Sequence, residues 1–287
     1  KPTGRDVGRY FQEGGNSMII NHNMSAHFVQ RQLAGAGARM GDSIEKLSSG
    51  HRINKAGDDA SGLAVSEKLR SQIRGIAQAT RNAQNGISFL QTAEGSMQEM
   101  HSILHRMREL SIQGANQIYS TEDRLQIQVE VSQLKQEIDR IVDVTSFNQL
   151  KILDGSLKDM RFHVGPDKDQ SIAVSIDSMD TKTLKVDAVD ITTAQAANNS
   201  LGSIDGAVNA VSKQRANVGA WQNRMEHVVN ALSVAEENLT AAESRIRDTD
   251  MAREIIEFSR NEILTHTGTA MLVQANIQSK TVLKLLG

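Results

Sequence analysis

Residues 204–246, IDGAVNAVSKQRANVGAWQNRMEHVVNALSVAEENLTAAESRI, decide the fold because their apolar side chains recur at alternating intervals of three and four. This is the heptad pattern of helices that pack along a shared seam. At ~1.5 Å per residue the stretch forms a helix about 63 Å long. Such a rod cannot cover its own seam, so other helices must cover it. The seam positions are Ile204, Ala207, Val211, Gln214, Val218, Trp221, Met225, Val228, Leu232, Ala235, Leu239, Ala242 and Ile246.

The first half of the chain supplies helices with matching stripes. The second of them begins at Ser120, which stands three residues before Asp123 as in a capping box. Three long helices are therefore predicted to pack as one antiparallel bundle. The stripe of the first comprises Ile73, Ile76, Thr80, Ala83, Ile87, Leu90, Met97, His101 and Leu104, and that of the second comprises Ile127, Val131, Leu134, Ile138 and Ile141.

A different pattern holds between residues 145 and 194. Gly155, Gly165 and Pro166 interrupt it, and apolar residues alternate with polar ones around Phe162 and Ile172. Alternation of this kind between turn residues is typical of β-hairpins. The sequence thus predicts a mainly α protein with a small β-hairpin region, which we expect at one tip of the bundle, and with no large outer domains.

The two ends carry a second apolar system with the same three-and-four spacing. Glycines in the first segment, at 35, 37 and 41, each cost about 1 kcal/mol relative to Ala in a helix. That segment needs a partner, and the second segment is the natural one. Two slender helices still leave apolar surface over, which predicts contacts with other copies of the chain. The stripe positions are Leu33, Gly37, Met40, Ile44 and Leu47 at one end, and Ile255, Phe258, Leu264, Gly268, Met271 and Ala275 at the other.

Composition excludes several classes of protein. The 287 residues contain no Cys, which excludes disulfide-stapled and Cys-ligated zinc folds. The 32 Lys and Arg against 34 Asp and Glu give a net charge of −2, which argues against nucleic-acid binding. No apolar run approaches the roughly 18 residues of a membrane-spanning helix, so no membrane insertion is expected.

These patterns divide the chain into parts. Residues 1–17 are polar and Gly-rich and are expected to be a non-native or disordered leader. Residues 18–60 with 250–287 are expected to form a terminal coiled-coil domain. Residues 61–249 are expected to form the helical bundle domain, with the β-hairpin region at 145–194.

A search for chemistry finds no catalytic, cofactor-binding or metal site that we would predict. His101 and His105 have the spacing of metal ligands on a helix, but no third ligand follows the same spacing, and a helix-surface or bundle contact is favoured. Asp58 and Asp59 are adjacent carboxylates, for which a cap or turn is favoured over acid–base work. Phosphate-loop spacing is absent. Three basic residues on a helix flank are expected to form ion pairs: Arg70, Arg74 and Arg81.

Long stretches of the chain resemble bacterial flagellins. At one end these are IEKLSSGHRINKAGDDASGLAVSEKLRSQIRG at 44–75, LHRMRELSIQ at 104–113, QVEVSQLKQEIDRI at 128–141 and FNQLKILDG at 147–155. At the other they are AAESRIRDTDMAREI at 241–255 and ILTHTGTAMLVQANIQSKTVLKLLG at 263–287. The stretch MIINHNMSA at 18–26 is similar to the start of the periplasmic core flagellins of spirochaetes.

The resemblance implies a structural subunit that polymerises into the helical flagellar filament used for motility, and no enzyme. It also implies an inner tube built from both termini, type III export, and a periplasmic location if the source is a spirochaete. The implied partners are further copies of the chain, a flagellar export chaperone, cap and junction proteins, and sheath proteins, with no cofactor. The inner-tube contacts expected are Ile44, Leu47, Phe258, Leu264, Met271, Leu272, Leu285 and Leu286. A polar connector between layers is expected at Arg52, Asn54, Asp58 and Asp59.

The stretch LHRMRELSIQ is also similar to the part of flagellins that the innate immune flagellin receptor recognises. Arg106, Leu110 and Glu130 occupy the matching positions. Recognition would require these side chains to be exposed in the monomer.

Three alternatives remain open at this point. A hook–filament junction protein also has a coiled coil formed by its two ends, but its central motifs are weaker. A soluble helical-bundle enzyme would need convergent polar groups, and the heptad positions offer only His101, Gln214 and Thr80. A chemoreceptor-like signalling rod would need a membrane anchor.

Overall fold

A computed structural model describes residues 23–286, without the side chains of residues 279 and 282–286. The predicted leader, residues 1–17, lies outside the described residues. The described chain divides into two compact units. The first contains the residues up to Val65 and from Ser244 onward, and the second is Ser66–Glu243.

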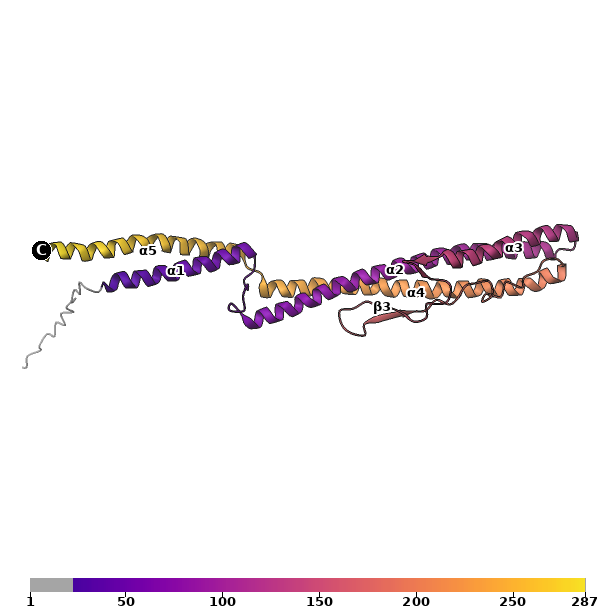
Figure 1. Ribbon diagram of the computed structural model, residues 1–287, viewed down its shortest axis with the longest axis horizontal. Coiled ribbons are helices and arrows are strands. Elements are labelled where there is room, and N and C mark those ends of the chain that lie inside the picture. Colours follow the sequence, from indigo (N-terminus) through magenta and orange to yellow (C-terminus); the bar gives the residue numbers. More distant parts are fainter. Residues whose placement is uncertain (1–22, 287) are drawn as a thin grey trace, which may run out of the picture. The chain divides into compact units, whose positions relative to one another are not determined.

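The second unit is a bundle of three helices, α2 (Ala60–Ala115), α3 (Thr121–Val144) and α4 (Ala194–Arg247), of which α2 and α4 extend beyond it (Figure 1). The heptad ladder of α4 is confirmed most clearly from Ile204 to Met225, where every predicted member except the half-buried Trp221 is in the core. Its later members, from Val228 to Ile246, are half-buried. The stripes of the other two helices are confirmed as well. Buried positions include Ile76, Ala83, Leu90, Met97 and Leu104 of α2 and Ile127, Val131 and Ile138 of α3.

The predicted capping box at the start of α3 is present in both directions. The backbone N–H of Asp123 donates to the Ser120 hydroxyl (3.2 Å), and the Ser120 N–H donates to the Asp123 carboxylate (2.9 Å). These bonds satisfy donors that have no partner within the helix. They also hold the pKa of the Asp123 carboxyl below its usual value, because the Ser120 hydroxyl and N–H both favour the charged form.

The region between α3 and α4 contains two small antiparallel hairpins, as the alternating pattern predicted. The strand β1 (Ser146–Phe147) pairs with β2 (Leu150–Lys151). The strand β3 (Met160–His163) pairs with β4 (Ser171–Val174), with Phe162 opposite Ile172. The turn of the first hairpin places Asn148 and Gln149 at positive φ, 50° and 68°, which is the conformation that two-residue hairpin loops require.

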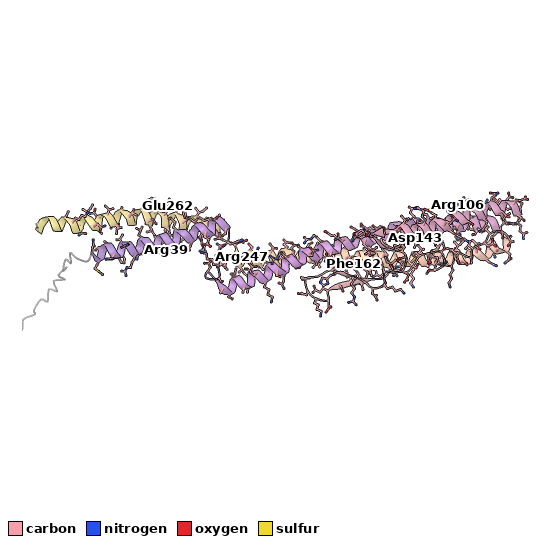
Figure 2. All side chains as sticks on the ribbon, viewed as in Figure 1. Arg39, Arg106, Asp143, Phe162, Arg247 and Glu262 are labelled. Atoms are coloured by element: carbon pink, nitrogen blue, oxygen red, sulfur yellow. The ribbon has the colours of Figure 1, made fainter. Side chains whose placement is uncertain are left out.

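The hairpin region lies along the flank of the bundle, not at its tip as the sequence suggested. A Cβ at Gly75 would lie 3.0 Å from Pro166, and one at Gly86 would lie 3.1 Å from Phe162, so small residues of α2 admit this layer. Figure 2 shows Phe162 alongside the bundle, away from its ends. Farther along α2, Gly114 meets Ile191. The order of the chain places these residues between two helices, but only their long-range packing decides where the segment lies, and sequence order does not contain that information.

Aromatic and polar contacts fasten this layer. Phe89 of α2 packs edge-on against Phe147, with ring centroids 5.8 Å apart, and at a tilt against Phe162 at 5.5 Å. On α3, Lys135 Nζ donates to the carbonyl oxygens of Asp187 (2.8 Å) and Val189 (2.6 Å). Residues 145–194 therefore form an integral side of the core.

Two of the basic residues expected to form ion pairs have described partners within α2. Arg70 pairs with Glu67 at 3.1 Å, as predicted, whereas Arg81 donates to the amide oxygen of Gln78 at 2.7 Å. Within residues 23–286, no helix combines the length and apolar composition needed to cross a bilayer.

Candidate assembly surface

The first unit is built on two helices that lie side by side, α1 (Met24–Ser49) and α5 (Met251–Leu286) (Figure 1). Asn23 Nδ2 donates to the Ala275 carbonyl (3.0 Å), and Arg39 Nε donates to Asn261 Oδ1 (3.2 Å). Because a later residue of α1 meets an earlier residue of α5, the helices are antiparallel. Asn23 caps α1 at its start, and Gly50, at φ 73°, ends it in the left-handed conformation that favours glycine.

The fully buried side chains in the described part of the seam between these helices are small or polar. Ala36 and Ser43 of α1 are buried, and so is Asn261 of α5. A Cβ at Gly268 would lie 3.2 Å from the Leu33 side chain, so the glycine allows close approach at that point. Burial of small residues contributes little hydrophobic free energy, because that energy follows the apolar area removed from water.

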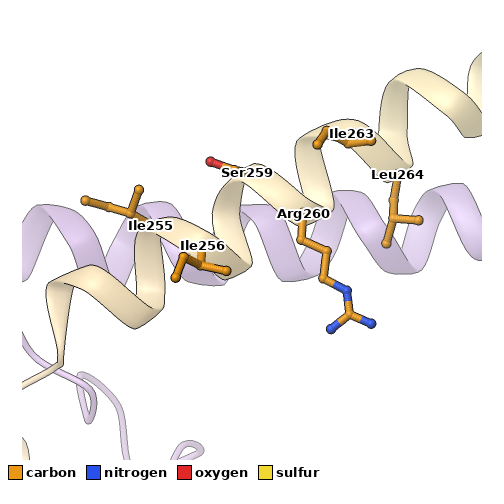
Figure 3. A pocket seen from close by; sticks show the side chains of 6 residues that line it. All are labelled: Ile255, Ile256, Ser259, Arg260, Ile263 and Leu264. Carbon is orange, nitrogen blue, oxygen red and sulfur yellow. The ribbon is translucent and has the colours of Figure 1, made fainter.

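Many large apolar side chains of the pair are exposed to solvent instead. Ile256 is 67% exposed and Ile263 is 64% exposed. A shallow depression of about 410 Å³ on α5 is lined by Ile255, Ile256, Ser259, Arg260, Ile263 and Leu264 (Figure 3). Scattered apolar residues are normal on protein surfaces, but a continuous stripe of this kind marks an interaction surface. The exposed apolar residues of the two helices are Met24, Phe28, Ile44, Met251, Ile255, Ile256, Ile263, Leu264, Met271, Val273 and Ile277.

The predicted inner-tube contacts fall into two groups. Ile44, Leu264 and Met271 are exposed and available to another molecule. Half-buried in the first unit are Leu47, Phe258 and Leu272. The side chains of Leu285 and Leu286 lie outside the described residues. Sequence reasoning missed Ile256, Ile263 and Val273, which stand beside the heptad positions and could have been found as a second stripe on the same helix.

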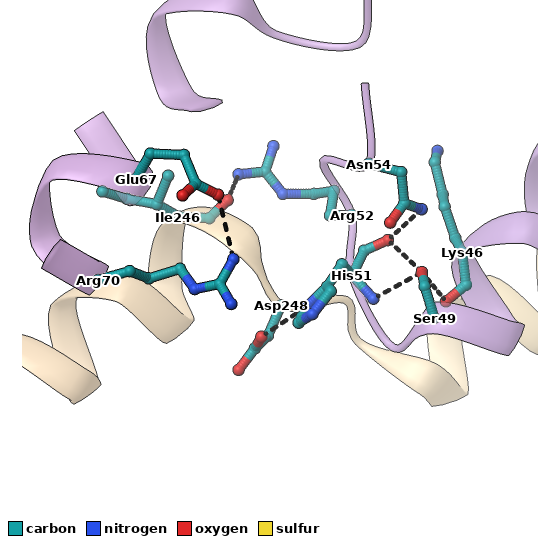
Figure 4. Close-up of polar contacts among 9 residues, drawn as sticks. All are labelled: Lys46, Ser49, His51, Arg52, Asn54, Glu67, Arg70, Ile246 and Asp248. Carbon is teal, nitrogen blue, oxygen red and sulfur yellow. Dashed lines mark hydrogen bonds and ion pairs between the residues drawn. The ribbon is translucent and has the colours of Figure 1, made fainter. Parts of the chain in front are cut away.

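The segment that follows α1 pairs with the segment that precedes α5 (Figure 4). His51 and Asp248 form an isolated antiparallel bridge, flanked by bonds from Arg52 N to the Arg247 carbonyl (2.6 Å) and from Thr249 N to the Gly50 carbonyl (3.0 Å). The His51 and Asp248 side chains approach to 3.2 Å. This pairing was not predicted, because a single bridge leaves no periodic signature in the sequence.

The predicted connector residues stabilise the same segment locally. The Arg52 guanidinium donates to the Ile246 carbonyl, and Asn54 Nδ2 donates to the His51 carbonyl at 3.1 Å. All these bonds join residues of the first unit. A role as connector between filament layers stays a prediction.

The adjacent carboxylates form a turn and a helix cap, as favoured from the sequence. Asp58 Oδ2 accepts from the N–H groups of Asn54 and Lys55, both at 3.0 Å. These donors hold the pKa of the Asp58 carboxyl below its usual value, the Lys55 N–H having the larger effect. Asp59 Oδ1 accepts from Gly62 N at 2.8 Å, which caps the start of α2.

The residues that match the immune-recognition stretch lie on α2 and α3 of the second unit. Arg106 Nε pairs with Glu130 Oε1 at 2.8 Å, and both side chains are about half exposed. Leu110 is only 2% exposed and belongs to the core. Two of the three residues are thus brought together at the surface, whereas the third lacks the exposure that recognition was expected to require.

Two family models match most of the chain. The bacterial flagellin N-terminal helical region matches residues 20–158, and the bacterial flagellin C-terminal helical region matches residues 201–286. The first match includes α1, α2 and α3, and the second includes α5 and most of α4.

Whole proteins give the same result. The chain is 52% identical to flagellin FlaB1 of Treponema pallidum (strain Nichols) and 52% identical to the flagellar filament 33 kDa core protein of Treponema phagedenis, covering 94% of this chain and 100% of each relative. A putative flagellar hook-associated protein from Vibrio parahaemolyticus shares the fold, with a TM-score of 0.58 at 16% identity over 67% of this chain and 100% of that one. The helical pair, the three-helix bundle and these matches together establish that the chain belongs to the bacterial flagellins.

Proposed function

We propose that this flagellin, a structural subunit that assembles with copies of itself into the flagellar filament, forms its inner lattice through the exposed apolar stripe of α1 and α5. The observation that supports the proposal most directly is that α5 has two different faces. Asn261 and Gly268 face its helix partner, while Ile256 and Ile263 face outward. Large apolar side chains of α5 are therefore left on the surface that is available to other molecules.

Burial of the apolar stripe between copies would supply free energy for assembly. Complete burial of one Ile or Leu side chain contributes about 1.5–3 kcal/mol. Several such residues per subunit would offset part of the ordering entropy of the terminal segments. Contacts between unlike surfaces repeat without closing, and this yields a helical filament and not a ring.

Sedimentation of purified protein tests the proposal. Deletion of the last ~20 residues should abolish pelletable polymer while far-ultraviolet circular dichroism still reports a helical bundle. The double variant Ile256→Glu/Ile263→Glu should have the same effect on a full-length chain. Glu262→Gln is the matched control, because it changes a charge on the same exposed turn of α5 and removes no apolar contact. Normal polymerisation of the truncated chain and of the double variant would contradict the proposal.

The stripe also supports proposals about partners. Before assembly the exposed apolar stripe would be covered by a bound export chaperone. At the two ends of the polymer the same stripe would contact cap and junction proteins. The two Treponema relatives described above include a filament core protein, which favours a periplasmic flagellum enclosed by sheath proteins. Co-purification of the monomer with each candidate partner, compared between wild type and the double variant, distinguishes these roles.

We further propose that the exposed Arg106–Glu130 pair forms a recognition surface for the innate immune flagellin receptor, with Leu110 supporting it from the core. In a reporter-cell assay with monomer, Arg106→Ala should reduce the response. Arg108→Ala is the control, because Arg108 is an exposed arginine of the same helix that pairs with Asp205 of α4 at 2.7 Å. Equal responses from the two variants would refute the assignment.

A further inference from the structure

A pair of histidines on α2 has a geometry that the assembly function does not use. His101 and His105 are one helical turn apart, and their Nε2 atoms approach to 2.9 Å. The ring centroids are 4.4 Å apart and the ring planes meet at 81°. Two side chains of neighbouring turns therefore direct the same nitrogen to one point.

The distance between the nitrogens fits a shared metal ion. Imidazole nitrogens bind a divalent transition metal at about 2.1 Å, so two ligands at a right angle lie about 3.0 Å apart, whereas a tetrahedral angle would place them about 3.4 Å apart. The observed 2.9 Å corresponds to the right angle. Right-angle coordination is typical of square-planar or tetragonal Cu²⁺ and Ni²⁺.

The surroundings leave room for such an ion. His105 is exposed, so water can occupy the remaining coordination positions. Among the described residues no third His, Cys, Asp or Glu joins the two histidines in a group that could hold a metal. Arg215 of α4 is a cation near His101, and its guanidinium pairs with Glu94 at 3.7 Å, which partly neutralises it.

We propose that His101 and His105 form a bidentate site for a divalent transition metal ion, with Cu²⁺ or Ni²⁺ as the fitting class. The ion takes the place of the hydrogen that one Nε2 now shares with the other. Both neutral rings then ligate through Nε2 and carry their single hydrogen on Nδ1, so the ring that donates in the present contact gives up its Nε2 hydrogen to water and takes one from water at Nδ1. Bound in this way, the ion joins two consecutive turns of α2 and stabilises the folded helix by linkage.

Titration of the full-length monomer with CuCl₂ or NiCl₂, followed by calorimetry, tests the site. His105→Asn and His101→Asn should each weaken binding at this site by roughly tenfold or more, since even loss of an outer-shell partner costs about 10–100-fold in metal affinity. His227→Asn should leave the binding unchanged. His227 is an exposed histidine of α4 whose neighbours one turn away, Asn223 and Ala231, are not metal ligands of this type.

A variant that builds the same histidine spacing on another helix shows whether the measurement can detect such a site. Ala231→His places a histidine four residues after His227 on a helix, and it should add a second binding event of similar affinity. Electron paramagnetic resonance of the Cu²⁺ complex should show two coupled nitrogens in the wild type and one in His105→Asn. If His105→Asn binds as the wild type does, or if His227→Asn loses the same affinity, the ring contact is a hydrogen bond only. Because His105 is exposed, its variant decides the question even if His101→Asn disturbs the core.

Discussion

Asn261 of α5 accepts a hydrogen bond from Arg39 of α1 across the seam, with 3.2 Å between Arg39 Nε and Asn261 Oδ1. The asparagine side chain is 4% exposed and also donates to the Glu257 carbonyl. A buried polar residue at a heptad position fixes the alignment of two helices and lowers their stability relative to an apolar residue. The Arg39–Asn261 contact thus fixes the register of the terminal pair.

We predict that Asn261→Leu keeps α1 and α5 helical but loosens their register. The chain has no Cys, so an engineered pair reports alignment without background. A Cβ at Gly268 would lie 3.8 Å from Leu33 Cβ, which is the mean separation in disulfides. Leu33→Cys/Gly268→Cys should therefore oxidise rapidly in the wild-type background and more slowly with Asn261→Leu. The shifted pair Met40→Cys/Gly268→Cys should gain cross-linking in that variant. Unchanged yields for both pairs would contradict a register role.

Two glycines of α2 should respond in opposite directions to alanine. At Gly114 a new Cβ would lie within 2.2 Å of Ile191, so Gly114→Ala should destabilise the bundle by about 1–3 kcal/mol. At Gly95 nothing lies within 4 Å, so Gly95→Ala should stabilise it by about 0.5–1 kcal/mol. Urea unfolding of the monomer measures both. Stabilisation by both variants would show that helix propensity alone decides the effect, and destabilisation by both would contradict the prediction for Gly95.

Lys135 should control access to the segment that joins the hairpins to α4. Lys135→Met leaves the Asp187 and Val189 carbonyl oxygens without their donor, which costs about 1–3 kcal/mol. Trypsin cleavage after the exposed Lys182 and Lys185 should then accelerate roughly tenfold, because it follows local opening. Gln136→Met, on the exposed face of the same turn, is the control and should leave cleavage unchanged. Equal rates for both would mean that packing, not Lys135, holds the segment.

The capping box predicts a pH dependence at the start of α3. The pKa of Asp123 is lowered in the folded chain, chiefly by the Ser120 hydroxyl. A lowered pKa means that the contribution is present above the unfolded value of about 3.9 and is lost as the pH falls through the folded value. A carboxyl-carbon titration by NMR should give Asp123 a midpoint below about 3.9. Ser120→Ala should raise that midpoint, and a midpoint that stays put would exclude the hydroxyl as its cause.

The bundle could be predicted because apolar residues fill its seams. Val211, Val218 and Met225 repeat with the heptad, and each is completely buried. The exposed positions between them are polar enough to make the repeat visible. The capping box at Ser120 was equally visible, because its bonds join residues three apart in the sequence.

The packing of α1 against α5 could be predicted only in part, because polar and small residues in their seam leave no apolar repeat in the sequence. Hydrophobic periodicity selected Leu264 and Met271 of α5, which are exposed, and could not select Asn261 or Thr265, which have lower exposure. The pattern also selected Leu33 and Phe258, which are half-buried, so it combined positions of the seam with positions of the exposed stripe. The bridge between His51 and Asp248 escaped as well, because it depends on contact between segments almost two hundred residues apart.

The small side chains packed between α1 and α5 have a consequence for protein engineering. Since one side of α5 holds its neighbour in the chain and another side carries the bulky aliphatic groups, the two can be redesigned separately. Replacing Gly268 with a larger residue would test how closely α1 and α5 can pack. Replacing Ile256 with a smaller residue would weaken adhesion of the exposed stripe to another molecule. A designer could therefore vary the adhesion of the exposed stripe with a graded series of side-chain sizes and leave the packing of α1 against α5 unchanged.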